Sequence, residues 1–279
     1  PNVEVIEDSA FKDCTSLTEL EIKKLAIINS FVFSGCCNLQ TIEIPHTVTK
    51  IKQNAFQDCK SLTSIKIPSS VESISSSAFR GCSKLAQIEW SRVKSIGDGI
   101  FYGCSELQDI SIPTSIQIIP NNFVSLCTSL TQITLPISIT SIGNCAFKGC
   151  TALVDVILPQ KNSLISIGDF AFQGCNQIQE IDLPKSLIKI GRSAFAECTS
   201  LTSISIPFNI NCIESGVFNG CTNLSTVTLA KKGNIALIQE YAFEDCTALT
   251  TIAIPENITT IGNKAFKGCT NLQTVELSE

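Results

Sequence analysis

The feature that most constrains the fold of this chain is a sequence repeat of about 23 residues. One copy reads Ile51-x-x-x-Ala55-Phe56-x-x-Cys59-x-x-Leu62-x-x-Ile65-x-Ile67-Pro68. A unit this short has one apolar side and nothing of its own to bury it against, so neighbouring copies must stack. The period is marked by twelve ladder cysteines: Cys14, Cys36, Cys59, Cys82, Cys104, Cys127, Cys150, Cys175, Cys198, Cys221, Cys246 and Cys269.

The length of the repeat varies mainly in the link that follows each proline. The spacing from Ile51 to Cys59 recurs in every copy, whereas the link is longer around Gln160-Lys161-Asn162 and around Lys231-Lys232-Gly233. Tolerance of insertion at a single point predicts a packed frame with one exposed turn.

Each unit is expected to contain two extended segments and one turn. Residues 62–67 end in an alternation of β-branched residues that predicts a strand, which Pro68 stops because it cannot donate to a ladder. A shorter extended segment is expected at 71–74. The Ala-Phe-x-x-Cys segment is too short for a regular helix and predicts a turn that directs the ring inward. The predicted core phenylalanines are Phe11, Phe33, Phe56, Phe79, Phe101, Phe147, Phe172, Phe195, Phe218, Phe243 and Phe266.

Two units depart from this pattern. Val124 occupies the phenylalanine position of its unit, Phe123 the alanine position, and Leu126 the position that is otherwise glycine or acidic. We expect a local repacking there, with a possible bend. Trp90 replaces the last strand isoleucine and lacks the following proline. It is either an oversized side chain that covers its coil or an aromatic binding anchor.

Composition excludes several classes of protein. The formal net charge of −5 and pI near 5.1 argue against nucleic-acid binding. No apolar run approaches the roughly 18 to 20 residues that cross a bilayer, so we expect no membrane insertion within this segment. The chain begins at Pro1 without a signal pattern, and its last unit lacks a polar cap. These features predict a fragment of a longer chain, with ends open to self-association.

The fifteen cysteines leave three interpretations open: a packing ladder, some disulfides, or metal and redox chemistry. The single histidine, His46, cannot complete a Cys/His zinc set. In-register side chains on parallel coils keep their Cβ atoms near 4.8 Å apart, beyond the roughly 3.5 to 4.5 Å of a disulfide. We therefore favour reduced, buried thiols. Cys37, Cys145 and Cys212 lie off the ladder and are better candidates for exposed or reactive thiols.

Catalytic chemistry has little support in the sequence. A Ser-His-acid or Cys-His site needs an imidazole, and His46 lies in a Pro45-His46-Thr47 link where a solvated loop residue is expected. No nucleotide-binding or zinc-protease motif is present. The sequence predicts a protein that is not an enzyme and carries no cofactor or metal.

The positions that the repeat leaves free are the candidate binding residues. In a Leu-x-x-Ile-x-Ile strand, the residues two and four after the leucine point to solvent. They are mainly acidic in the first eight units and small in the ninth to eleventh. The alternative is a solvated sheet whose charges only prevent aggregation. The candidate residues are Glu19, Glu21, Glu43, Lys66, Glu89, Asp109, Asp155, Glu180, Asp182, Ser203, Ser205, Thr226 and Thr228.

The Leu-x-x-Ile-x-Ile-Pro and Ala-Phe-x-x-Cys segments at this period resemble the BspA-like (treponemal-type) leucine-rich repeats over essentially the whole chain. The resemblance implies a single solenoid domain over residues 1–279. It would be a right-handed, curved superhelix of about twelve 23-residue coils, mainly β and irregular, with a parallel sheet on its concave face. Such proteins often act in surface adhesion and partner binding.

Three functional hypotheses follow. The first is a surface-displayed or secreted, non-enzymatic module that recognises a protein or glycan ligand through the concave face. The second is an intracellular scaffold that docks onto a large assembly such as the cytoskeleton, which reduced thiols fit at least as well. The third, a lattice-binding threonine surface, needs a flatter array than a curved solenoid offers.

Overall fold

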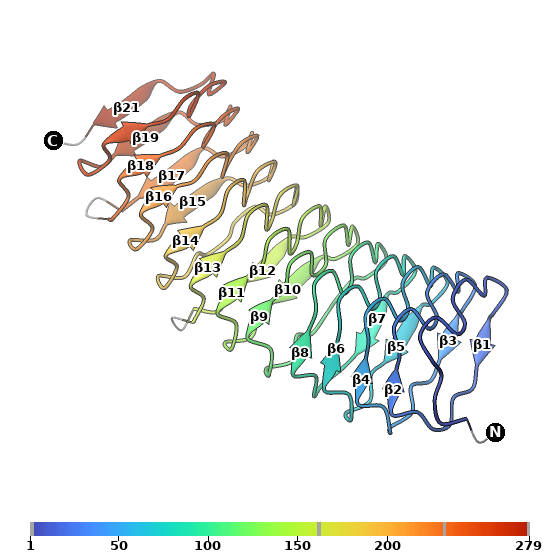
Figure 1. Ribbon diagram of the computed structural model, residues 1–279. Coiled ribbons are helices and arrows are strands. Elements are labelled where there is room, and N and C mark those ends of the chain that lie inside the picture. Colours follow the sequence, from blue (N-terminus) through green and yellow to red (C-terminus); the bar gives the residue numbers. More distant parts are fainter. Residues whose placement is uncertain (1–2, 161–162, 231–232, 278–279) are drawn as a thin grey trace.

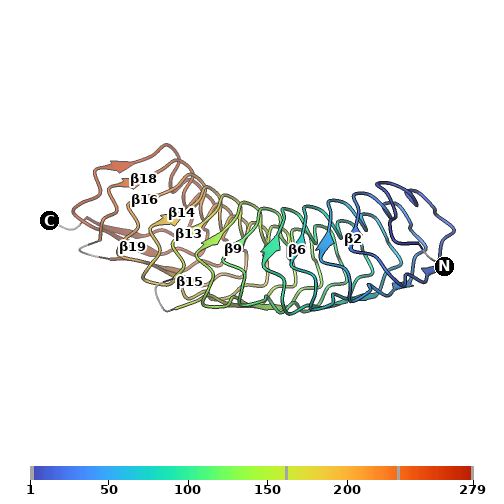
Figure 2. The same ribbon diagram turned by 60° about the horizontal axis from the view of Figure 1, so that its bottom comes forward.

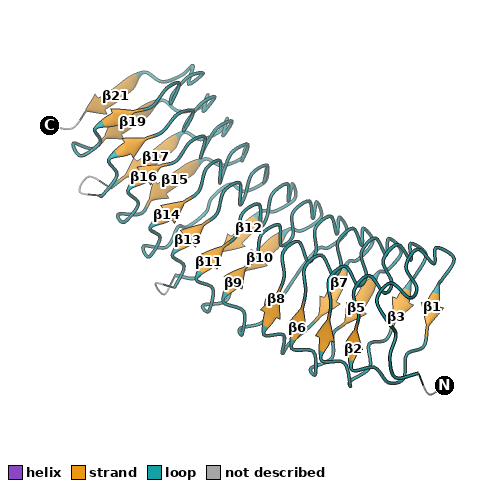
Figure 3. Ribbon diagram, in the orientation of Figure 1, coloured by secondary structure: helices purple, strands orange, loops and turns teal. Residues whose placement is uncertain are grey.

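The computed structural model describes residues 3–160, 163–230 and 233–277. Over these residues the chain winds into a solenoid of stacked coils built from strands and turns, with no helix (Figures 1 and 3). The predicted repeat solenoid is therefore confirmed. Lys161, Asn162, Lys231 and Lys232 of the two longer links lie outside the described residues. The described part contains no helix long and apolar enough to cross a bilayer.

One side of the solenoid carries the strands predicted from the Leu-x-x-Ile-x-Ile pattern, and we call it the long-strand face. Its strands pair in parallel with the equivalent strand one coil away, so that Ile65 lies opposite Ile88. Residues 109–112 and 180–183 also lie on this face but form no regular strand. The strands are β1 (Glu19–Leu20), β3 (Thr41–Ile42), β5 (Ser64–Lys66), β7 (Gln87–Glu89), β10 (Gln132–Thr134), β12 (Asp155–Ile157), β15 (Ser203–Ile206), β17 (Thr226–Leu229), β19 (Thr251–Ile254) and β21 (Thr274–Leu277).

A second side, the short-strand face, carries two-residue strands that confirm the second extended segment of each unit. Figure 2 shows many of them in a row along the bent solenoid. They form three parallel sheets, β2-β4-β6-β8, β9-β11-β13-β14 and β16-β18-β20. The strands are β2 (Ile27–Ile28), β4 (Lys50–Ile51), β6 (Ser73–Ile74), β8 (Ser95–Ile96), β9 (Ile118–Ile119), β11 (Ser141–Ile142), β13 (Ser166–Ile167), β14 (Lys189–Ile190), β16 (Cys212–Ile213), β18 (Leu237–Ile238) and β20 (Thr260–Ile261).

The Ala-Phe-x-x-Cys segments form tight turns that stack along a third side, the turn edge. Each turn holds two residues with positive φ, as at Asn54 (56°) and Asp58 (57°). The second of these positions is the one where glycine or an acidic residue recurs, because glycine adopts positive φ without a steric penalty. The Phe56 N–H donates to the Ala78 carbonyl of the next coil at 2.8 Å. Backbone hydrogen bonds therefore join the coils at the turn edge as well as in the sheets.

The phenylalanines form a stack through the core, as predicted. The Phe147 and Phe172 ring centroids lie 5.0 Å apart with an interplanar angle of 7°. Nine of the eleven predicted rings are fully buried, whereas Phe11 and Phe266 in the terminal coils are half-buried. A terminal ring has a neighbouring coil on one side only, so solvent reaches its other side.

The repacking predicted around Val124 is confirmed. Phe123 is fully buried and meets Phe101 edge-to-face at 5.9 Å and Phe147 at 6.4 Å, so the parallel stack is interrupted. Val124 is buried as well, while Leu126 has φ of 63° and is 40% exposed. The short-strand face breaks near the same place, because β8 and β9 belong to different sheets. Moving the ring by one residue changes the packing but preserves the turn.

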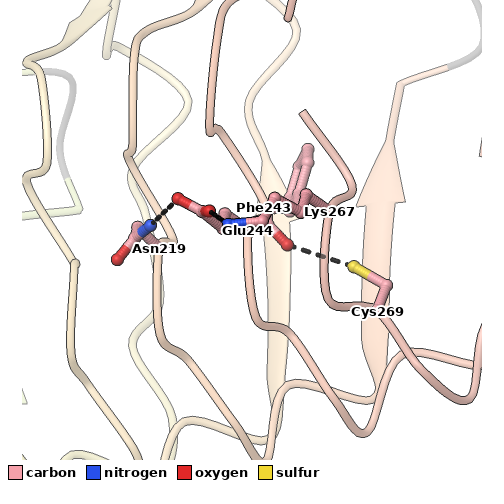
Figure 4. Close-up of polar contacts among 5 residues, drawn as sticks. All are labelled: Asn219, Phe243, Glu244, Lys267 and Cys269. Carbon is pink, nitrogen blue, oxygen red and sulfur yellow. Dashed lines mark hydrogen bonds and ion pairs between the residues drawn. The ribbon is translucent and has the colours of Figure 1, made fainter. Parts of the chain in front are cut away.

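The ladder cysteines bind the coils together as hydrogen-bond donors. The Cys59 thiol donates to the Phe33 carbonyl of the preceding coil at 3.2 Å. Figure 4 shows the last such bond, from Cys269 to the Phe243 carbonyl at 3.1 Å. All fifteen cysteines are free thiols. Burial raises the pKa of Cys150 and of Cys198 to about 12. The prediction of a packing ladder therefore describes the structure better than disulfides do.

One part of the cysteine prediction is wrong. Cys14 belongs to the ladder by sequence but is exposed. It lies in the first coil of the structure, where no described coil precedes it to supply a carbonyl or to cover the thiol. Cys269, in the last coil, is half-buried. Position in the stack, rather than position in the repeat, decides the burial of the terminal thiols.

Candidate binding surface

The thirteen candidate residues all lie on the long-strand face with their side chains at or near the surface. Twelve are exposed and Ser203 is half-buried. The alternation along β17 shows the cause, since Thr226 and Thr228 are exposed while Val227 and Leu229 are buried. Parallel pairing in register places equivalent side chains of successive coils side by side. The face therefore presents two parallel rows of residues.

The first part of this face is acidic. Lys66 lies next to Glu89 at 3.7 Å, and Glu21 next to Lys23 at 3.4 Å. All four side chains are largely exposed, so these ion pairs contribute little to stability. The rows nonetheless hold more carboxylates than cations as far as Asp182. This excess sets the sign of the local potential.

The last part of the face is formed by small hydroxyl residues. Ser203 pairs with Thr226 and Ser205 with Thr228. Thr251 pairs with Thr274 in the same way. Ile157 separates the two parts, because its side chain is 58% exposed in a row that is otherwise mostly polar. The predicted change of character along the face is therefore a property of a single continuous surface.

Two segments of the face are joined to the preceding coil through side chains. Between regular coils a backbone donor bridges the edge, as where the Ile67 N–H donates to the Glu89 carbonyl at 2.8 Å. At the equivalent place Trp90 Nε1 donates to the Ser111 carbonyl at 2.5 Å. Gln160 Nε2 likewise donates to the Asp182 carbonyl at 3.0 Å. The two coils without a regular long strand are the two held in this way.

The surroundings of Trp90 favour the interpretation that it covers its coil. The indole is half-buried and meets Phe101 edge-to-face with centroids 5.6 Å apart. Its N–H is already engaged by Ser111. The part of the ring that stays accessible lines a hollow in the surface.

Sequence reasoning missed a row of hollows at the proline end of the long strands. Their volumes are about 510, 460 and 380 Å³. The first two share Lys66 and Pro68, and the second and third share Ser111. The prolines are the sequence signal for this feature, because each ends a strand and turns the chain away from the sheet.

The off-ladder cysteines do not lie on the long-strand face as a group. Cys37, Cys145 and Cys212 are each half-buried, so none is fully exposed. Burial raises the pKa of Cys145 and of Cys212. A raised pKa lowers the thiolate fraction and therefore works against the predicted reactivity of these two thiols.

A polar network crosses three coils at the turn edge (Figure 4). The Glu244 carboxylate accepts from Asn219 Nδ2 at 2.9 Å and from Lys267 Nζ at 2.7 Å. The hydrogen bond and the charge of Glu244 raise the pKa of Lys267. These groups satisfy one another, so the network reinforces the stack and leaves no donor or acceptor directed at a ligand.

Comparison with known proteins agrees with the fold. The family described as "BspA type Leucine rich repeat region (6 copies)" matches residues 4–131, 72–199, 117–247 and 230–279. A search of curated proteins found no match. A leucine-rich repeat protein from Bacteroides ovatus is similar in structure, with 31% identity and a TM-score of 0.82. That match covers 98% of this chain and 76% of the other.

Two further bacterial structures are similar. A leucine rich cell surface protein from Faecalibacterium prausnitzii has 27% identity and a TM-score of 0.53, over 99% of this chain and 83% of that one. A leucine-rich repeat protein from T. pallidum has 26% identity and a TM-score of 0.50, over 67% and 78%. With the matched residues spanning nearly the whole sequence, this chain belongs to the BspA-type leucine-rich repeat family.

Proposed function

We propose that this chain is a non-enzymatic binding module, displayed at a cell surface, that recognises a protein or glycan ligand through its long-strand face. The observation that carries the proposal is the pair of exposed, in-register rows held on a fully buried core. Such a face is rigid before binding, so little conformational entropy is lost when a ligand docks. The acidic part would favour a basic region of the ligand.

The surface location draws support from the family and from one neighbour. The Faecalibacterium prausnitzii structure is described as a cell surface protein. Leucine-rich repeat solenoids of this kind are generally binding proteins rather than enzymes, since each repeat adds area to one extended face.

The first experiment measures binding to arrays of purified extracellular proteins and of glycans. The test variant is the triple substitution Asp155→Asn, Glu180→Gln and Asp182→Asn, which neutralises the centre of the face. We expect the unaltered chain to bind at least one array member saturably and the triple variant to bind it about tenfold more weakly. Equal binding by the triple variant, or no binding by the unaltered chain, would refute the proposal.

A matched control removes the same charge away from the long-strand face. The substitutions Glu106→Gln, Glu240→Gln and Glu256→Gln alter three exposed carboxylates outside its rows. This variant should bind like the unaltered chain. Weakening of equal size in both variants would indicate a general charge effect.

The rival function is an intracellular scaffold, and the fifteen free thiols favour it, because thiols stay reduced inside cells. Antibodies against this chain, applied to cells of the source organism, separate the two. Labelling of intact cells supports the surface module. Labelling that requires permeabilisation supports the scaffold and contradicts the surface proposal.

A further inference from the structure

The row of hollows at the proline end of the long strands is a continuous groove, which we call the proline groove. It runs across the first six coils from Glu21 to Thr134 and is lined by the last exposed residue of each strand segment. Five steps of about 4.8 Å give a length of about 24 Å. An extended peptide rises about 3.3 Å per residue, so the groove accommodates about seven residues.

The lining of the groove carries a negative charge. Four carboxylates line it, those of Glu21, Glu43, Glu89 and Asp109, against the two cations of Lys23 and Lys66. Four minus two leaves a net charge of −2. Lys23 pairs with Glu21 and Lys66 with Glu89, whereas within the described part of the chain Glu43 and Asp109 have no ion-pair partner. Two carboxylates are thus open to a cationic ligand.

An aromatic surface lies midway between these two carboxylates. Trp90 lines the middle hollow, and Phe101 and the Ser111 carbonyl fix the orientation of its ring. In coil order, Glu43 lies in the second, Trp90 in the fourth and Asp109 in the fifth. An indole held in one orientation attracts a guanidinium group through its π face. Arginine can also pair with a carboxylate in a bidentate manner, which lysine cannot.

We propose that the proline groove binds an extended, arginine-containing basic segment of a partner protein, about seven residues long. The inference rests on the proposed binding function and adds the location and chemistry of one contact. The segment lies across the strands. Its arginines pair with Glu43 and Asp109 and stack on Trp90.

Trp90 is the only tryptophan in the chain, so its fluorescence reports the groove directly. The probe is a synthetic heptapeptide in which arginine and serine alternate, and the control peptide has glutamate in place of arginine. We expect a saturable fluorescence change with the arginine peptide that weakens as salt is added, and none with the glutamate peptide. No saturable change, or the same change with both peptides, overturns the inference.

A pair of variants locates the binding. Glu43→Gln with Asp109→Asn should weaken binding of the arginine peptide about fivefold, the loss expected from two exposed ion pairs. Glu180→Gln with Asp182→Asn removes the same charge from the same face outside the groove and should leave the affinity unchanged. Equal weakening in both pairs would also overturn the inference. Melting temperatures of both variants check that each is folded.

The outcomes separate this inference from the proposed function. If the arginine peptide fails to bind while the Asp155, Glu180 and Asp182 triple variant loses its array ligand, the groove is refuted and the binding face stands. If the peptide binds at the groove while no array member binds, the groove stands and the proposed ligand classes are refuted.

Discussion

The indole Nε1 of Trp90 donates a hydrogen bond to the carbonyl oxygen of Ser111, one coil further along, at 2.5 Å. In a regular coil this carbonyl position accepts from the backbone, as Glu89 does from the Ile67 N–H. A side chain thus maintains the connection between coils where the regular strand is missing. Removing this donor tests how much of the stack depends on it.

Trp90→Phe should lower the free energy of unfolding by about 1 kcal/mol, because it keeps an aromatic ring against Phe101 but removes the indole N–H. Urea denaturation followed by circular dichroism measures the change. As Ser111 is exposed, water can partly satisfy its carbonyl, which keeps the effect small. A loss above about 3 kcal/mol would mean that packing rather than hydrogen bonding dominates at this site.

Phe147→Ala should lower the free energy of unfolding by about 3 to 5 kcal/mol. The ring is fully buried and stacks on Phe172 at 5.0 Å, so its removal leaves a cavity inside two adjoining coils. Chemical denaturation gives the value. A retained melting temperature would contradict the inward placement of the rings.

The matched control for this substitution is Phe208→Ala. Phe208 is 51% exposed in a link between coils, so its removal should change stability by less than about 0.5 kcal/mol. A large loss here would show that the link packs on the core.

Leu126→Gly should raise the free energy of unfolding by about 1 kcal/mol. Leu126 has φ of 63° and is 40% exposed, and glycine relieves the strain while little buried apolar area is lost. The gain appears as a higher melting temperature. The converse substitution, Gly149→Ala, should lower it, since Gly149 has φ of 70° and an added Cβ would lie 2.7 Å from Leu126 Cδ2. Opposite signs in the two variants are required.

The thiol ladder should make the protein less stable at alkaline pH. Burial raises the pKa of Cys150 and of Cys198 from 9.0 to about 12. Between these values the unfolded thiol releases its proton while the folded thiol keeps it, so the stability present below pH 9 is lost as the pH rises towards 12. Melting temperatures from pH 7 to 10 measure the slope, and Cys150→Ala with Cys198→Ala should reduce it. An unchanged slope in that double variant contradicts the assignment.

The repeat spacing sufficed to predict the solenoid, both extended segments of each unit and the inward phenylalanines. Each of these depends on a pattern that one coil contains within itself, such as Leu62-x-x-Ile65-x-Ile67 before Pro68. The outward direction of Asp155 and Thr226 followed from the same alternation. The exposure of Cys14 was not predictable in this way, because it depends on the absence of a covering coil in the structure.

The amino-acid sequence by itself determined which residues of each coil are buried, since hydrophobic periodicity within about 23 residues sets the inside and the outside. Tertiary structure alone decided what the coils do to one another. The thiol of Cys59 reaches the Phe33 carbonyl, Trp90 reaches Ser111, and the strand ends align into the proline groove. The physical reason is that a repeat encodes one coil, whereas these contacts exist only between coils, at distances fixed by stacking.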